Sequence, residues 1–169
     1  IGIGGGIGKG QTISVTGTTL FVQMSGADGV CVGTLDDGAE ISLAGCTAAF
    51  DTHLNSGVAI GAQTGTPTVS CDTTSITVIG SGHSLTAIGS QEGCGNLTLK
   101  ETSLSTQLTG QAITAVGSAD GQPSVTIRHC DVQIHLEGTQ ALDIGSFTGD
   151  ADVGKTAGLD RKSTSLNSS

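Results

Sequence analysis

Apolar and polar residues alternate along most of the chain, and the same alternation returns with a 28-residue period. The clearest marker is a glycine that follows an aliphatic residue, as in "VAIGAQTG" at 58–65, "TAIGSQEG" at 86–93 and "TAVGSADG" at 114–121. The marker glycines are Gly33, Gly61, Gly89, Gly117 and Gly145. Self-similarity at a fixed period predicts a repeat architecture. We number the positions of each row from its marker glycine, which is position 0.

Apolar residues recur in the rows at positions 8, 10, 15, 17 and 27, with polar residues between them. Position 8 holds Ile41, Val69, Leu97 and Val125, and position 15 holds Ala48, Ile76, Leu104 and Val132. A first row that begins at Gly4 fits the same columns with one extra residue. The period of two indicates strands with one buried face. Each row therefore predicts three short strands separated by turns, with the marker glycine at the corner that ends the third strand.

Rows of three strands with like residues in register predict an all-β fold, a right-handed parallel β-solenoid. The 28-residue period corresponds to one coil, and there are about five coils. The handedness follows from the preference of parallel strand crossovers. Neighbouring coils stack about 4.8 Å apart, so five coils form a rod about 24 Å long.

The stretch "IGIGGGIGKGQTISVTGTTLFV" at 1–22 resembles bacterial surface β-helices with Gly-rich repeats of the type "GAGIGGG…GTITI", a carbohydrate-binding-domain-like group. The resemblance covers residues 1 to about 153. It implies a right-handed parallel β-helix in an extracellular or cell-surface location. It supplies no site residues.

The last ten residues, "DRKSTSLNSS" at 160–169, do not continue the pattern. They resemble the translated product of a common sequencing adapter, "DRKSTRLNSS", and only Ser165 differs. We therefore expect residues 1–153 to form the solenoid, as a fragment of a longer repeat protein from a metagenomic read. Residues 154–169 are expected to be an unstructured tail, with 160–169 artefactual.

Composition narrows the function classes. The chain has 169 residues, 28 glycines, three phenylalanines and neither Trp nor Tyr, so its core must be thin and aliphatic. A net charge of −9 with six basic residues argues against nucleic acid as a partner. No apolar run approaches the ~20 residues of a membrane span. The five cysteines form no C-x-x-C pair and no histidines stack, so we expect no cofactor or metal and assign the cysteines to packing.

Two outward columns carry hydroxyl and small polar side chains. Position 9 holds Ser14, Ser42, Ser70, Thr98 and Thr126, and position 7 holds Thr12, Glu40, Thr68, Asn96 and Ser124. These columns predict a flat polar face that suits sugar binding or ice binding. Ser and Thr are also ordinary residues of exposed strands, so a purely structural role stays open.

The next corner carries charges of both signs. Position 11 holds Asp72, Lys100 and Arg128, with Glu101 and His129 beside them at position 12. A β-helix lyase would use carboxylates and a basic residue of this kind on a uronate. An exposed ladder of salt bridges is the structural alternative. At position 3, Asp36, Glu92 and Asp120 are weak calcium candidates, since they also suit turns and Thr64 interrupts the column.

The expected function is a non-enzymatic rigid module of a secreted or cell-surface protein, in an adhesive or spacer role. Weak polysaccharide binding through the Ser/Thr face is left open. The alternatives are a polysaccharide lyase with Lys100, Arg128, Asp72 and Glu101, and an ice-binding solenoid. We also expect end-to-end association, because terminal coils of a solenoid expose unpaired strand edges.

Overall fold

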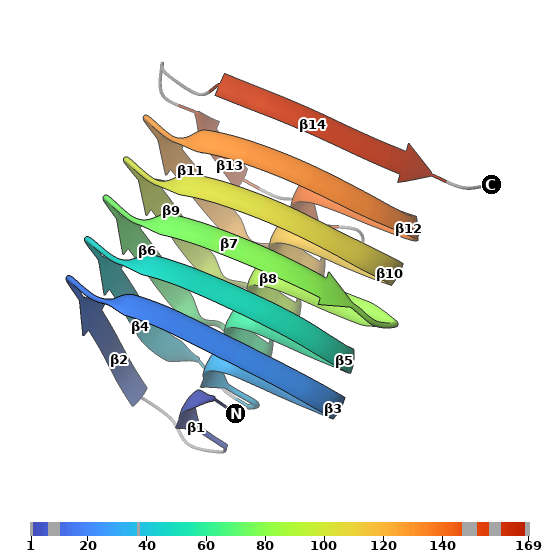
Figure 1. Ribbon diagram of the computed structural model, residues 1–169, viewed down its shortest axis with the longest axis horizontal. Helices are drawn as coiled ribbons and strands as arrows, with labels where there is room; N and C mark the ends of the chain where they lie inside the picture. The colour runs from blue at the N-terminus through green and yellow to red at the C-terminus, as the bar shows by residue number, and fades with distance from the viewer. Residues whose placement is uncertain (1, 7–10, 37, 147–151, 156–159, 168–169) are drawn as a thin grey trace.

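The computed structural model describes residues 2–6, 11–36, 38–146, 152–155 and 160–167, the last two stretches by their backbone alone. All regular structure in these ranges is β-strand, and no helix occurs among them. The strands nearest the viewer in Figure 1 run from left to right as the chain climbs from β3 to β14, and the fainter segments return behind them. The coil is therefore right-handed, and the predicted parallel β-solenoid is confirmed.

The coils form two parallel sheets. The six-stranded sheet contains β2 (Gln11–Thr16), β4 (Ala39–Ala44), β6 (Thr68–Asp72), β9 (Asn96–Lys100), β11 (Ser124–Arg128) and β13 (Asp152–Lys155). The eight-stranded sheet contains β1 (Ile3–Gly5), β3 (Thr19–Thr34), β5 (Thr47–Thr64), β7 (Ser75–Ser81), β8 (Ser84–Glu92), β10 (Ser103–Asp120), β12 (Asp131–Ser146) and β14 (Asp160–Asn167). Every strand pair is parallel, and the chain alternates between the sheets as it climbs.

The register between coils follows the 28-residue period. Gly33 pairs with Gly61, Gly61 with Gly89, and Gly89 with Gly117. In the first row Gly4 pairs with Gly33, one residue more than a full period away, while Gln11 pairs with Ala39, a full period away. The extra residue of that row therefore lies between Gly5 and Gln11. The apolar columns predicted from the sequence are thus confirmed as neighbours in space.

The marker glycine bends its strand without ending it, which corrects the sequence-based expectation. Strand β5 continues three residues past Gly61, and β10 continues three residues past Gly117. The marker glycines have φ between 132° and 143°, a region that L side chains rarely adopt. Pairing with the next coil continues through the bend. At a separate point, before the marker glycine, the predicted second and third strands join into one long strand in four coils, and they are separate only as β7 and β8.

The corner between the two sheets uses a left-handed residue at position 12 in every described coil. Gly17 and Gly45 hold it with φ of 59° and 61°. Thr73, Glu101 and His129 hold it with φ of 52°, 49° and 52°. Non-glycine residues in this region are uncommon and cost about 1–2 kcal/mol each. The corner geometry is therefore imposed by the stacking of the coils and not by residue preference alone.

A column of small hydrogen-bond donors lines the inner side of this corner, at position 13. The Thr74 hydroxyl donates to the carbonyl oxygens of Asp72 and Leu43, at 2.9 and 3.2 Å. The Thr102 hydroxyl donates to those of Lys100 and Cys71, at 2.9 and 3.2 Å. Cys46 and Cys130 occupy the same column and donate through their thiols at 3.2 Å. These two cysteines therefore replace threonine as donors to main-chain carbonyls.

The core is a continuous aliphatic ladder between the sheets. Its largest fully buried side chains include Phe50, Ile41, Leu43, Leu54, Ile60, Ile76, Ile88, Leu97, Leu99, Leu104, Leu108 and Ile113. The third side of the coil is buried on both faces, since residues 57–62 and 85–91 are all buried. Gln91 contributes to this burial. Its amide donates to the carbonyl oxygens of Ser84 and Gly57, at 2.7 and 3.2 Å, and its oxygen accepts from Ser56 at 2.7 Å.

The described backbone beyond residue 151 lies in two short strands. Asp152–Lys155 pairs with β11, in the 28-residue frame. Asp160–Asn167 pairs with β12, with Asp160 opposite Asp131. In this register Arg161, Ser163 and Ser165 fall opposite the apolar residues Val132, Ile134 and Leu136. The strand pairing therefore continues where the apolar column of the sequence stops.

Candidate functional site

The predicted hydroxyl face is the outward side of the six-stranded sheet. Ser14, Ser42, Ser70, Thr98 and Thr126 pair with one another from coil to coil, as do Thr12, Glu40, Thr68, Asn96 and Ser124. These side chains are exposed or half-buried, while Ile41, Val69 and Leu97 between them are buried. The columns therefore form one surface on which the hydroxyl of one coil lies beside that of the next, about 4.8 Å away.

This face can exchange hydrogen bonds with a ligand but offers no ring for stacking. The two phenylalanines whose side chains the structure describes are elsewhere: Phe50 is buried and Phe21 lies on β3 in the other sheet. Glu40 and Asn96 interrupt the hydroxyl column at position 7. A ligand on this face would therefore exchange hydrogen bonds with water for hydrogen bonds with the protein, each worth about 0.5–1.5 kcal/mol net.

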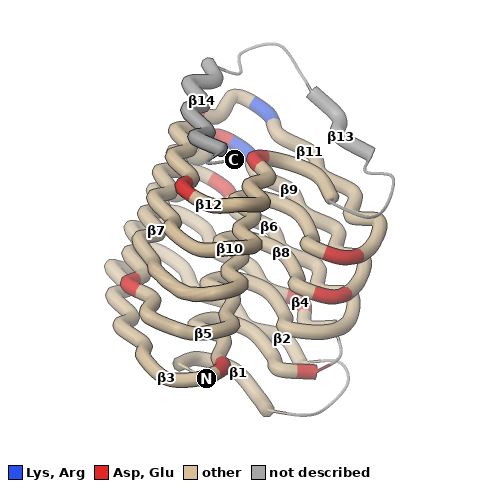
Figure 2. The backbone as a smooth tube through the Cα atoms, turned by 90° about the vertical axis from the view of Figure 1, so that its right-hand side faces the viewer, with Lys and Arg blue, Asp and Glu red and all other residues tan. Residues whose placement is uncertain are grey.

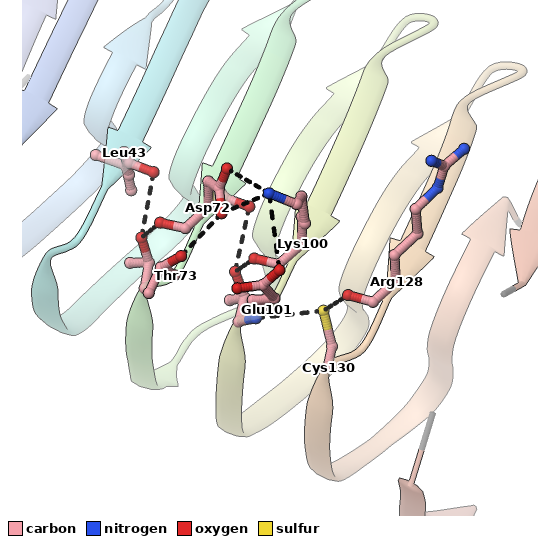
Figure 3. Close-up of polar contacts among 10 residues, drawn as sticks. Leu43, Asp72, Thr73, Lys100, Glu101, Arg128 and Cys130 are labelled. Atoms are coloured by element: carbon pink, nitrogen blue, oxygen red, sulfur yellow. Dashed lines mark hydrogen bonds and ion pairs between the residues drawn. The ribbon is translucent and has the colours of Figure 1, made fainter. Parts of the chain in front are cut away.

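The charged corner lies at the end of β6, β9 and β11, and Figure 3 shows its side chains. Lys100 Nζ lies 3.1 Å from Asp72 Oδ2 and 3.8 Å from Glu101 Oε1. The three side chains are between 44% and 53% exposed. Arg128 pairs with Lys100 through the backbone ladder, but in the part of the chain described here no carboxylate lies within 4.0 Å of its guanidinium. Of the four predicted lyase residues, three are brought together and Arg128 is left apart.

The electrostatics of this corner favour charged side chains and not a neutral base. The hydrogen bond from Lys100 lowers the pKa of the Asp72 carboxyl, and the Thr73 hydroxyl lowers it further. The hydrogen bond to Asp72 raises the pKa of the Lys100 amine above its ordinary value. A general base must lose its proton near the working pH. The salt bridge therefore holds Lys100 in the protonated form, which a catalytic base cannot use.

The acidic column at position 3 continues through the coils without forming a cage. Glu92 pairs with Asp120 and with Thr64 along the backbone, and the Thr64 hydroxyl donates to Asp36 at 2.9 Å. Within the described ranges, no group of three or more His, Cys, Asp or Glu side chains is arranged to hold a metal ion. Asp36 therefore accepts a hydrogen bond from the residue at the same position of the next coil.

The five cysteines are free thiols, and four of them are buried. Burial raises the pKa of the Cys71 thiol to about 12, and the nearby Cys130 and Cys46 raise it as well. Burial raises the pKa of the Cys31 thiol to about 11. Thiols of this kind are poor nucleophiles at neutral pH, because the thiolate is the reactive form. Cys94 is exposed, and its sulfur accepts a hydrogen bond from the Gln122 main chain at 3.3 Å.

The sequence did not reveal that two histidines bind carboxylates on their own strands. His53 Nε2 lies 3.0 Å from Asp51 Oδ1, and His135 Nε2 lies 3.0 Å from Glu137 Oε1. The two pairs form no column, because His53 and His135 occur at different positions of the repeat. The signal that could have found them was the spacing of two, which places both members of a pair on the same face of a strand.

Comparison of the chain with protein-family models, with curated proteins and with solved structures found no significant match. In the described ranges, no helix is long and apolar enough to span a bilayer. The arrangement of the side chains is therefore what supports a function.

Among the residues that Figure 2 colours by charge, acidic residues occur on coils along the length of the solenoid and basic residues near its upper end. Lys100 and Arg128 are the basic residues whose side chains the structure describes. With 15 acidic and six basic residues in the whole chain, the protein suits a neutral or cationic ligand better than an anionic one. A uronate polymer, the substrate class of the lyase alternative, is anionic.

Proposed function

We propose that this chain is a rigid, non-enzymatic solenoid module of a secreted or cell-surface protein, in an adhesive or spacer role. It contacts a neutral polysaccharide weakly through the hydroxyl face. The observation that supports the proposal is the unbroken register of position 9, where Ser14, Ser42, Ser70, Thr98 and Thr126 follow one another on five paired strands. The secreted or cell-surface location rests on the sequence resemblance.

Rigidity follows from the pairing of the coils. Each internal coil is hydrogen-bonded to a neighbour on both sides through both sheets. Bending the rod would break several of these hydrogen bonds at once. A rod of this kind can hold a ligand-binding face, or a neighbouring domain, at a set distance.

Binding of polysaccharide is tested with a glycan array probed by the 169-residue chain. The variant carries Ser70→Val, Thr98→Val and Thr126→Val, which removes three hydroxyls and keeps residues that favour exposed strands. A matched control carries Ser75→Val and Ser103→Val on the outward side of β7 and β10, where both residues are exposed. Binding should be lost in the first variant only. No binding by the unaltered chain would leave the spacer role alone, and equal binding by both variants would contradict the choice of face.

The lyase alternative has weaker support. Lys100 is held protonated by Asp72, and Arg128 lies apart from both carboxylates. Incubation with polygalacturonate and calcium, followed at the absorbance of the unsaturated product, tests it. Activity that Arg128→Ala abolishes would replace the non-enzymatic proposal.

The ice-binding alternative would use the same hydroxyl face. Glu40 and Asn96 interrupt its position 7 column, which reduces the flat area of uniform hydroxyls. Recovery of the chain from a growing ice surface, lost on Thr98→Val, would support this alternative over polysaccharide binding.

The proposal includes end-to-end association. Strand β2 is the last strand of the six-stranded sheet, and its described pairing is with β4 on one side only. An edge of this kind can pair with a strand of another chain. Size-exclusion chromatography with light scattering tests this over a range of concentrations that begins low. A molar mass equal to that of a monomer at every concentration would contradict it.

A further inference from the structure

The outward face of the eight-stranded sheet carries a hydrogen-bonded set of serine, histidine and aspartate. His53 Nδ1 lies 2.8 Å from Ser81 Oγ, and His53 Nε2 lies 3.0 Å from Asp51 Oδ1. The amide of Gln23 donates to the second oxygen of Asp51 at 3.0 Å. Three adjacent strands supply these residues: β3 supplies Gln23, β5 supplies Asp51 and His53, and β7 supplies Ser81.

The backbone holds the set in place. Gln23 pairs with Asp51 in the ladder between β3 and β5, and His53 pairs with Ser81 in the ladder between β5 and β7. Asp51 and His53 are two residues apart, so their side chains project from the same face of β5. Side chains on paired strands have less positional freedom than side chains on loops, and this is the placement that a reactive site requires.

The hydrogen-bond partners determine the tautomer of the neutral imidazole. An ionised carboxylate can only accept hydrogen bonds, so the nitrogen that faces Asp51 must carry the proton. Nε2 is that nitrogen. Nδ1 then presents its lone pair to the Ser81 hydroxyl, which donates to it. A nucleophile bonded to a base, and a base oriented by a carboxylate, is the arrangement that activates a serine.

We propose that Ser81 is a nucleophile, activated by His53 and positioned through Asp51, that accepts acyl groups from activated esters. Ser81 Oγ attacks the ester carbonyl carbon as its proton passes to His53 Nδ1. The bond from that carbon to the leaving oxygen breaks, and the imidazolium returns the proton to the leaving alcohol. Water then attacks the acyl-serine with His53 as base, which releases the carboxylic acid and restores the hydroxyl.

The surroundings limit the substrate to activated esters. The main-chain N–H of Gly82 donates to Thr109 O at 3.0 Å, and that of His83 donates to Asn55 O at 2.9 Å. Neither N–H is free to stabilise the oxyanion, and one such donor is typically worth about 10²–10³ in rate. Ser81 and His53 are exposed, so a bulky leaving group can extend into solvent. Aryl esters with small acyl groups meet both conditions.

The same sheet provides an internal comparison. His135 binds Glu137 with the same spacing of two residues. Among the described residues, no hydroxyl bonds to the other nitrogen of His135. Among the side chains that the structure describes, only the His53 pair therefore has a hydroxyl in place as a nucleophile. The proposal goes beyond the role as a rigid module and replaces its non-enzymatic part, because it adds an esterase site on the eight-stranded sheet.

The test is labelling of the 169-residue chain with a fluorophosphonate probe and mapping of the label by tandem mass spectrometry. Ser81 Oγ forms a bond to phosphorus as the phosphorus–fluorine bond breaks and fluoride leaves, so a single adduct on Ser81 is expected. His53→Ala should slow the labelling by about 10²-fold. Ser25→Ala is the matched control, since Ser25 pairs with His53 from the other side and should leave labelling unchanged.

The role of Asp51 has its own readout. The imidazole nitrogen shifts of His53 in an NMR spectrum should report the Nε2–H tautomer in the unaltered chain and a mixture of tautomers in Asp51→Asn, together with slower labelling. The proposal is overturned if Ser81 and Ser25 label equally, if His53→Ala labels as fast as the unaltered chain, or if no adduct forms.

Discussion

A Cβ atom placed on Gly33 would collide with the carbonyl oxygen of Gly61, the equivalent residue one coil further on. The same relationship joins Gly61 to Gly89, Gly89 to Gly117 and Gly117 to Gly145. Glycine is therefore required at this position for two reasons. Its φ lies near +140°, and the next coil occupies the space that a side chain would need. This ladder explains why the glycine spacing is the most regular feature of the sequence.

Gly89→Ala should lower the free energy of unfolding by about 3–5 kcal/mol, because it adds backbone strain and a collision with main-chain atoms that cannot move aside. Gly45→Ala is the matched control. Gly45 also has positive φ, but no atom lies within 4 Å of its Cβ position, and Thr73, Glu101 and His129 adopt the same conformation. Its loss should be about 1–2 kcal/mol. Urea denaturation of both variants measures the difference, and equal losses would contradict the role of the ladder.

Two threonines in the interior should respond in opposite ways to the same substitution. The hydroxyl of Thr106 is buried without a hydrogen-bond partner, in the column of Val78 and Ile134. Thr106→Val should stabilise the fold by about 1 kcal/mol, since it removes a hydroxyl that is desolvated on folding and gains no hydrogen bond in return. Thr102→Val should destabilise it by about 1–2 kcal/mol, because two carbonyl oxygens lose their donor. Thermal unfolding of both variants checks the signs, and a destabilised Thr106→Val would show that its hydroxyl has a partner.

Native thiol chemistry should distinguish one cysteine from the other four. Cys94 is exposed, whereas Cys31, Cys46, Cys71 and Cys130 are buried. A thiol reagent at neutral pH should therefore titrate one equivalent in the folded chain and five after denaturation in urea. Cys94→Ser should reduce the native value to zero. Rapid reaction of more than one thiol would mean that the coils open on the timescale of the experiment.

The Asp72–Lys100 pair should make a small, salt-sensitive contribution to stability that depends on pH in two directions. The pKa of Asp72 is below its usual 3.8, so its contribution is complete above that value and is lost as the pH falls through the lowered pKa. The pKa of Lys100 is above its usual 10.5, so its contribution is complete below that value and is lost as the pH rises through the raised pKa. The melting temperature of Asp72→Asn, compared with the unaltered chain across pH and salt, checks this. Since both side chains are about half exposed, molar salt should remove the difference.

The sequence predicted the columns because a strict period sets the register as well as the fold. Leu43, Cys71, Leu99 and Ile127 can be recognised as neighbours from the sequence alone, since each lies one repeat period from the next. The continuation of the strands past the marker glycine was not predicted, because glycine weakens a strand interior, and here the stacked coils keep the pairing intact through the bend. The donor role of Cys46 and Cys130 was hidden for a related reason. It depends on where main-chain carbonyls point at the corner, and residue types do not report this.

The hydrogen-bonded set of Ser81, His53 and Asp51 could be recognised only from the structure. Ser81 lies one repeat period after His53, so the period makes the two neighbours, but the same period also makes Ser25 a neighbour of His53. Which serine bonds to the imidazole depends on the side-chain rotamer, and the sequence carries no signal for it. Likewise, the register predicts that Asp72 and Lys100 are neighbours, and the structure shows their ion pair. The register also makes Arg128 a neighbour of Lys100, but it does not predict whether Arg128 pairs with a carboxylate.

The constant period also affects how the chain folds. Between Gln11 and Asp152, each new coil closes a loop of the same length on the coil before it. The entropy lost on closing a loop depends on its length, so every coil after the first costs the same chain entropy to add. Once two coils have paired, folding can spread from them in equal steps toward either end. A longer rod of the same repeat would then gain stability with each coil while the hardest step, the first pairing, stayed the same.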